Sequence, residues 1–159
     1  MDHRLTPLIS LDLVIRNKFC YTLTLCFLRL YPSPVPDFLS PFLSFLNFPQ
    51  SSTQAQNLQP TIVTLRMLCE IAGEVHDPLL KSARKWTAER NNRDGQVRDS
   101  LRVRGEVKII LDGLVSLVEQ GIKSEGQPMM QEVLEWSMNT LATWARESHF
   151  TIPPIPVLI

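Results

Sequence analysis

The chain has 159 residues, the length of one ordinary domain, and 44% of them are hydrophobic while 20% are charged. This balance is typical of a globular protein and excludes a wholly disordered chain. The 16 basic and 16 acidic residues cancel, so any attraction to nucleic acid or to acidic membranes must come from local clusters of charge.

The first long apolar segment predicts a helix over residues 13–31. Residues 19–28, FCYTLTLCFL, are apolar or neutral, but Arg16, Lys18 and Arg29 close the segment on both sides. The run is much shorter than the roughly 20 apolar residues that span a bilayer, so we expect no membrane insertion. A secretory signal is the nearer alternative, yet RLYPSPVP contains no small-residue cleavage site.

Prolines divide this helix from the next one. Proline cannot continue a helix and disfavours the helical conformation in the residue before it, so YPSPVP ends the first helix. A second helix is predicted over residues 36–47, with Asp37 as its N-terminal cap and with phenylalanine and leucine at helical spacing behind it. The two elements form a helical hairpin.

Three more helices are predicted from apolar side chains that recur every three or four residues. Their ranges are 58–77, 96–121 and 128–147. No segment shows the alternating pattern of a half-buried strand, so the predicted fold class is all-α. Periodicity alone is equally consistent with a bundle of four or five helices and with an α-solenoid, in which helical hairpins stack in a row.

The strongest concentration of charge lies between Lys81 and Lys108. Arginine and lysine can neutralise phosphates, and an aromatic side chain such as Trp86 can stack on a base, so this segment is a candidate RNA-binding surface. The alternative is a solvated helix face whose charges point to water or pair with each other. The candidate contact residues are Arg84, Lys85, Arg90, Arg93, Arg98, Arg102 and Arg104.

Catalytic chemistry has little support in the sequence. The three histidines are scattered, and none lies at a metal-ligand spacing from cysteines or carboxylates. Neither a serine-centred elbow nor a glycine-rich phosphate loop is present, so we expect no enzyme activity, no metal and no cofactor. Glu70 and Glu74 are expected on a solvated helix face. Cys20, Cys26 and Cys69 are expected to be small core residues rather than a disulfide framework.

Five short motifs follow one another along the chain: RNK at 16–18, YP at 31–32, and then LRMLCEIAGEVHD, RDGQVRDSLRVR and VLEWSMNTLATW. Together they resemble the early HEAT-repeat region of the exportin-T family, in the importin-β (karyopherin) superfamily. Arg16, Asn17 and Lys18 match an RNK that precedes an apolar helix, and Tyr31 with Pro32 matches the YP turn that follows it. LRMLCEIAGEVHD, RDGQVRDSLRVR and VLEWSMNTLATW resemble later helices of the same region, in the same order. SPVP after the turn and the tail FTIPPIPVLI depart from the family's pattern.

This resemblance implies both a fold and a function. The fold would be an α-solenoid of HEAT-like helical hairpins over residues 1–148, followed by a divergent proline-rich tail over residues 149–159. The function would be that of a nuclear export receptor that binds tRNA together with GTP-bound Ran, contacts nuclear pore proteins and shuttles between nucleus and cytoplasm. The candidate arginines would contact RNA or Ran. Family members are several-fold longer, so this chain would be a fragment or a shortened homologue.

Two alternatives remain open from the sequence. One is a helical-repeat scaffold that binds a protein partner, and the other is a different karyopherin-type transport receptor without tRNA specificity. Binding to RNA or to Ran would separate these alternatives from the first interpretation.

Overall fold

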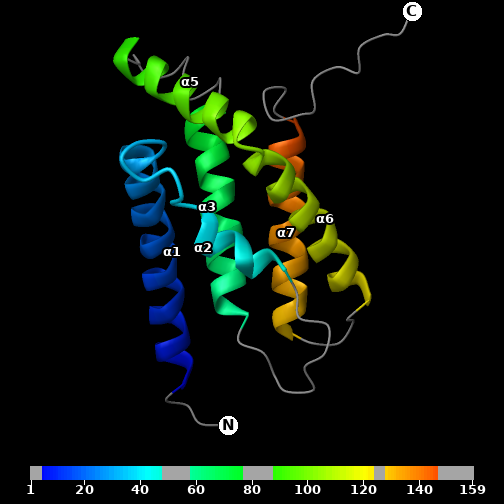
Figure 1. Cartoon of the computed structure of the whole chain (residues 1–159). Coiled ribbons are helices and arrows are strands. Elements are labelled where there is room, and N and C mark those ends of the chain that lie inside the picture. Colours follow the sequence, from blue (N-terminus) through cyan, green and yellow to red (C-terminus); the bar gives the residue numbers. More distant parts are fainter. Residues whose placement is uncertain (1–4, 48–57, 77–87, 124–127, 147–159) are drawn as a thin grey trace, which may run out of the picture.

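The structure is a computed structural model of the chain, and it describes residues 5–47, 58–76, 88–123 and 128–146. Within these ranges every regular element is a helix (Figure 1), which confirms the predicted all-α class. The elements are α1 (Leu5–Leu30), α2 (Ser40–Leu43), the 3-10 helix η1 (Ser44–Leu46), α3 (Gln59–His76), α5 (Ala88–Val103), α6 (Glu106–Lys123) and α7 (Pro128–Arg146). None of these helices is both long and apolar enough to cross a membrane.

Helices α1, α3 and α7 lie side by side in one layer and run in the same direction (Figure 1). Four hydrogen bonds between neighbouring helices fix this direction. They join Cys20 Sγ to Val63 O (3.7 Å), Thr24 Oγ1 to Glu70 Oε2 (3.3 Å), Thr140 Oγ1 to Leu65 O (3.2 Å) and Trp144 Nε1 to Leu68 O (2.9 Å). In each pair of helices both partners advance along the chain together, so the three helices are parallel.

Parallel neighbours distinguish a solenoid from a simple bundle. In an up-and-down bundle, adjacent helices alternate in direction, whereas in a solenoid the equivalent helices of successive hairpins are parallel and their partners form a second layer. Here α2, η1 and α6 form that second layer, and α6 packs antiparallel against α7 (Figure 1). The helices are therefore stacked hairpins, as the resemblance to a HEAT-repeat family implies.

The core fills the space between the two layers. Its fully buried side chains include Phe27, Leu39, Leu46, Ile62, Leu65, Leu68, Ile71, Leu101, Ile110 and Trp144. Each aliphatic or aromatic side chain of this size stabilises the fold by ~1.5–3 kcal/mol when it is removed from water. Trp144 is 0% exposed, which identifies it as a packing anchor.

Arg16 of the RNK motif ties the layer together near the beginnings of α3 and α7. Its Nη2 atom lies 2.7 Å from Glu132 Oε1 on α7, and its Nη1 atom donates to Gln59 Oε1 on α3 at 3.2 Å. The Arg16 side chain is 10% exposed. A charge this well buried requires such partners, so Arg16 has a structural role.

The helix predicted over residues 96–121 is two helices in the structure. Helix α5 ends at Val103, α6 begins at Glu106, and Gly105 between them has φ = +76°. Glycine adopts this left-handed conformation without steric cost and commonly ends helices. The prediction missed the break because buried apolar side chains keep a helical spacing on both sides of it. Helix α5 also begins earlier than predicted, at Ala88.

The second predicted element is shorter than residues 36–47, because it consists only of α2 and η1. Asp37 does not cap it: Leu39 occupies the N-cap position of α2 without a side-chain hydrogen bond. The Asp37 carboxylate instead lies 3.0 Å from Arg104 Nη2. Helix α1 starts at Leu5, before the predicted range. The boundary predicted near residue 148 lies outside the described residues and stays a prediction.

Candidate functional site

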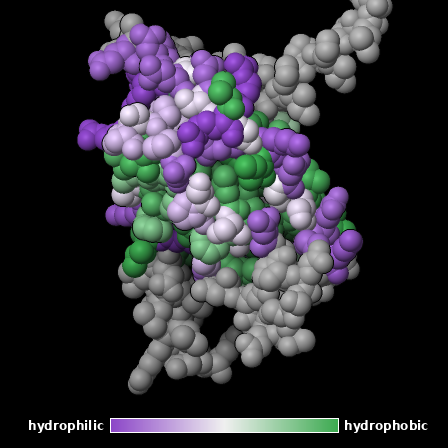
Figure 2. Space-filling model, in the orientation of Figure 1, coloured by the Kyte–Doolittle hydropathy of each residue, from purple (hydrophilic) through white to green (hydrophobic). Residues whose placement is uncertain are grey.

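Helix α5 carries most of the arginines predicted to contact RNA or Ran, and it lies across the end of the layer at which α1 and α3 finish (Figure 1). Val97 and Leu101 are its buried apolar side chains. Figure 2 shows hydrophilic residues gathered over α5 and hydrophobic residues over the middle of the molecule. The helix is therefore held by few apolar contacts, and its polar contacts decide its position.

Three of the predicted contact arginines bind other elements of the fold. Arg90 Nη2 lies 2.6 Å from Glu74 Oε2, Arg98 Nη1 donates to Val75 O at 2.8 Å, and Arg104 Nη2 lies 3.0 Å from Asp37 Oδ1. These side chains join α5 and the turn after it to α3 and to the segment before α2. Their first role is to hold α5 in place.

Arg104 also belongs to a buried cluster at the junction of α5 and α6. Tyr31 Oη donates to Glu106 Oε1 at 2.7 Å, and Arg104 Nε donates to the same oxygen at 3.2 Å. Burial, together with the hydrogen bond to the Glu106 carboxylate, raises the pKa of Tyr31 well above its ordinary value of 10.0. Tyr31 of the YP turn thus ties the end of α1 to the beginning of α6.

Arg93 and Arg102 differ from these three because their acidic partners lie on α5 itself. Arg93 Nη2 is 3.4 Å from Asp94 Oδ1, and Arg102 Nη2 is 3.4 Å from Asp99 Oδ1. The two arginine side chains are 38% and 51% exposed. Asp99 is 72% exposed, and exposed ion pairs contribute only ~0–1 kcal/mol, so Arg102 can turn to a ligand at little cost. Asp94 is 0% exposed, so Arg93 can add a ligand but is held more firmly by its buried partner.

The basic segment is less positive in the structure than its arginines alone indicate. Glu89, Asp94, Asp99 and Glu106 accompany the basic residues of α5 and the beginning of α6. Arg84 and Lys85, also predicted as contacts, lie outside the described residues, and their role stays a prediction. The described surface is therefore weakly basic.

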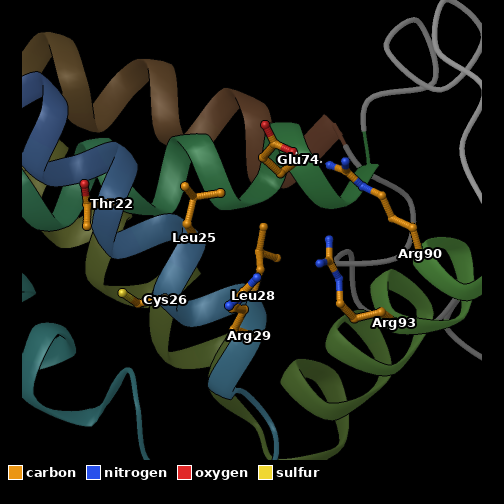
Figure 3. Close-up of a pocket in the computed structure, with 8 residues that line it drawn as sticks. All are labelled: Thr22, Leu25, Cys26, Leu28, Arg29, Glu74, Arg90 and Arg93. Carbon is orange, nitrogen blue, oxygen red and sulfur yellow. Dashed lines mark hydrogen bonds and ion pairs between the residues drawn. The ribbon is translucent and has the colours of Figure 1, made fainter.

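A pocket of about 460 Å³ lies between α1, α3 and α5 (Figure 3). We call it the arginine pocket, and its lining residues are Thr22, Leu25, Cys26, Leu28, Arg29, Glu74, Arg90 and Arg93. Sequence reasoning missed it because the lining residues come from three helices far apart in the chain. Arg29 and Glu74 carry no local signal that connects them with Arg90 and Arg93.

Two expectations about side-chain environments are wrong. Cys26 is exposed rather than in the core, although Cys20 is buried and Cys69 half-buried. Glu70 does not lie on a solvated face, since α1 packs over it. Burial raises the pKa of the Glu70 carboxyl, while the hydrogen bond from Thr24 and the charge of Arg66 oppose that rise. Within the described ranges no group of three or more His, Cys, Asp or Glu side chains could hold a metal ion.

Two layers of stacked hairpins, with parallel helices in one layer, define a helical-repeat protein. The chain belongs to the family described as Exportin 1-like protein, whose model matches residues 12–153. This is a karyopherin family of HEAT-type helical repeats, so the comparison confirms both the resemblance and the solenoid fold.

The individual relatives include fungal proteins named Exportin-T. The chain is 32% identical to the one from Coprinopsis cinerea and 30% identical to the one from Laccaria bicolor, in each case over 90% of this chain and 15% of the relative. It is 26% identical to Exportin-T of Pyricularia oryzae over 82% of this chain and 12% of that protein. No solved structure gives a significant match. The chain thus spans no more than 15% of the length of these relatives.

Proposed function

We propose that this chain is part of a nuclear export receptor that binds tRNA cooperatively with GTP-bound Ran and shuttles between nucleus and cytoplasm. The observation that carries this proposal is the match to proteins named Exportin-T over 90% of the chain. A solenoid supports it, because stacked repeats present a long continuous surface to a large ligand. Nuclear pore proteins would be further partners. GTP hydrolysis would belong to Ran, so the chain needs no catalytic group.

Among the described residues, Arg93 and Arg102 are best suited to contact tRNA. Folded RNA is recognised mainly through its phosphates and its shape, and these two side chains are the ones whose ion pairs stay within α5. Nine residues along a helix correspond to about two and a half turns. The two arginines therefore project from opposite sides of α5, and only one of them faces a given RNA helix.

The test is binding of labelled tRNA to the 159-residue chain at two salt concentrations, with and without GTP-loaded Ran. We compare Arg93→Gln, Arg102→Gln and the control Lys18→Gln, which removes the same charge from exposed α1. Salt-sensitive binding is expected, and the variant that faces RNA should lower the salt slope by about 1. A folded chain that binds no tRNA at either salt concentration, even with Ran, would contradict a tRNA contact in this segment and would make it a scaffold whose binding surface lies in other repeats.

A protein-binding scaffold, or another karyopherin-type receptor without tRNA specificity, is the second candidate. A weakly basic surface favours this second candidate. The surface is weakly basic because Arg90, Arg98 and Arg104 are engaged by other parts of the fold. Binding of GTP-loaded Ran without any tRNA binding would support the receptor that lacks tRNA specificity.

A further inference from the structure

The arginine pocket has an apolar side and a cationic side (Figure 3). Leu25 and Leu28 of α1 supply the apolar side, and Arg29 of α1 and Arg93 of α5 contribute to the cationic side. Glu74 is the acidic member of the lining, and it is engaged by Arg90 at 2.6 Å. The pocket therefore already holds one carboxylate against a guanidinium group and has two further guanidinium groups beside it.

The charges of Arg29 and Arg93 are poorly matched. In the part of the chain that the structure describes, Arg29 is exposed and has no ion pair. Arg93 is paired with Asp94 alone, at 3.4 Å, and its Nε atom is buried without a hydrogen-bond acceptor in the described structure. A buried donor without an acceptor is unfavourable. The Arg93 side chain is nevertheless 38% exposed, so an incoming anion can reach its guanidinium group, although not the buried Nε atom.

The apolar side of the pocket continues along α1. Tyr21 and Leu25 are 52% and 43% exposed and lie one helical turn apart, followed by Arg29, and the exposed Lys18 ends this apolar stripe on its N-terminal side. A side chain placed on this stripe gains stability by burying apolar surface. A phosphate backbone gains nothing there, and phosphates on a stiff RNA helix do not reach into a recess beside leucine side chains. The combination of apolar stripe and arginines fits a peptide better than RNA.

We propose that the arginine pocket binds an acidic segment of a partner protein. A carboxylate of that segment engages Arg29 and Arg93, and an adjacent apolar side chain packs on Leu25 and Leu28. The charge is complementary, since charge-assisted bonds between guanidinium and carboxylate are among the strongest in proteins. This site goes beyond the proposed tRNA receptor function, because neither Arg29 nor the leucines are assigned to RNA, and Arg93 is the one residue that both proposals use.

Cys26 provides a reporter inside the pocket. It is exposed and lines the pocket, whereas Cys20 is buried and Cys69 is half-buried and outside it. Alkylation of each cysteine of the 159-residue chain by iodoacetamide can be followed by peptide mass spectrometry. The probes are a capped hexapeptide of alternating leucine and aspartate, an alanine–aspartate version, inorganic phosphate and an oligouridylate.

The leucine–aspartate peptide should slow alkylation of Cys26 several-fold and leave Cys69 unchanged. Arg29→Gln and Arg93→Gln should each weaken the binding of this peptide by about tenfold, since each variant removes a charge-assisted hydrogen bond to the aspartate. Lys18 lies on the same side of α1 as Arg29, about 16 Å nearer the start of the helix. Lys18→Gln should therefore change peptide binding less than twofold. The alanine–aspartate peptide should bind more weakly because it buries less apolar surface.

Three results would overturn the proposal. Protection by oligouridylate or phosphate without protection by the peptide would assign the pocket to RNA or to free anions. An unprotected Cys26 in a chain whose circular dichroism is helical would show that the pocket binds none of the probes. If Lys18→Gln weakened peptide binding as much as Arg29→Gln does, the attraction would be an unspecific one between charges. Arg93→Gln can weaken the binding of both ligands, but Arg29→Gln should weaken peptide binding and leave tRNA binding unchanged, so this variant tests the two proposals separately.

Discussion

Arg98 closes the C-terminal end of α3. Its guanidinium group donates to Val75 O at 2.8 Å, and this carbonyl lies in the last turn of the helix. Such carbonyl groups have no partner within the helix. The contact is therefore a structural one, and it also fixes α5 against α3.

Replacing Arg98 by alanine should lower the free energy of unfolding by about 1–2 kcal/mol, because a charge-assisted hydrogen bond to a half-buried carbonyl is lost. Arg102→Ala is the matched control on the same helix, and it should change stability by less than about 0.5 kcal/mol. Denaturant titration of both variants provides the measurement. Equal stabilities would contradict the structural role of Arg98.

Tyr31 makes the stability of the folded chain depend on pH. Its pKa in the folded chain lies above the ordinary value of 10.0, so folding favours the protonated hydroxyl. The resulting stabilisation is present below about pH 10 and is lost as the pH rises, because the unfolded chain then releases the proton more readily.

Tyr31→Phe should therefore be less stable than the wild type by about 1–2 kcal/mol at pH 7, where it lacks the hydrogen bond to Glu106. Above pH 10 the wild type should lose stability more steeply than the variant, so the difference narrows. Unfolding curves at pH 7, 9 and 10.5 test this. Curves that stay parallel across that range would show that Tyr31 does not titrate differently on folding.

At the scale of the elements, α6 and η1 pack closely against each other within the second layer. A Cβ atom built on Gly113 of α6 would lie 2.9 Å from Leu46 Cβ, a separation that real Cβ atoms do not show. Leu46 is 1% exposed and cannot move into solvent without leaving the core. Glycine at this position therefore permits the close approach of α6 to η1.

Gly113→Ala should destabilise the chain by about 1–3 kcal/mol, the usual cost of overpacking. Gly73→Ala is the matched control, because a Cβ built on Gly73 meets no atom within 4 Å. That change should stabilise α3 by about 0.4–1 kcal/mol, since alanine favours the helix and restricts the unfolded chain. Thermal unfolding of both variants is the measurement, and a stabilised Gly113→Ala would refute the close contact.

Helices that bury a continuous apolar stripe are predictable from sequence, and α3 and α7 coincide closely with the ranges 58–77 and 128–147. The break at Gly105 was missed because buried apolar side chains keep a helical spacing within α5 and again within α6, although the step of six residues from Leu101 to Val107 departs from that spacing. Polar partners are also hidden, since Tyr31 and Glu106 are 75 residues apart and Asp37 and Arg104 are 67 apart. The sequence shows which residues are charged, but only the structure shows which residues they contact.

At the scale of the whole molecule, length limits function. The chain spans 15% of the length of the Exportin-T relatives from Coprinopsis cinerea and Laccaria bicolor. Enclosing both a tRNA and Ran requires a longer row of repeats than six α-helices and one 3-10 helix, the number in the described residues, can form.

We therefore expect that this chain alone does not restore tRNA export in cells that lack their own tRNA export receptor, even if it binds tRNA or Ran in solution. The measurement is the nuclear fraction of mature tRNA, with expression of the chain verified and the full-length relative as the positive control. Full rescue by the chain would show that these hairpins suffice for export.

The parallel layer also has an electrostatic consequence. Every helix carries a partial negative charge of about half an elementary charge at its C-terminal end. In an up-and-down bundle these ends alternate and largely cancel, but here α1, α3 and α7 finish at the same edge and their dipoles add (Figure 1). Arg29 lies in the last turn of α1, and α5 brings Arg90, Arg93 and Arg98 to the same edge. The positive charge of these arginines thus first neutralises an edge that the parallel helices make negative. An acidic ligand must compete with three helix ends for that positive charge.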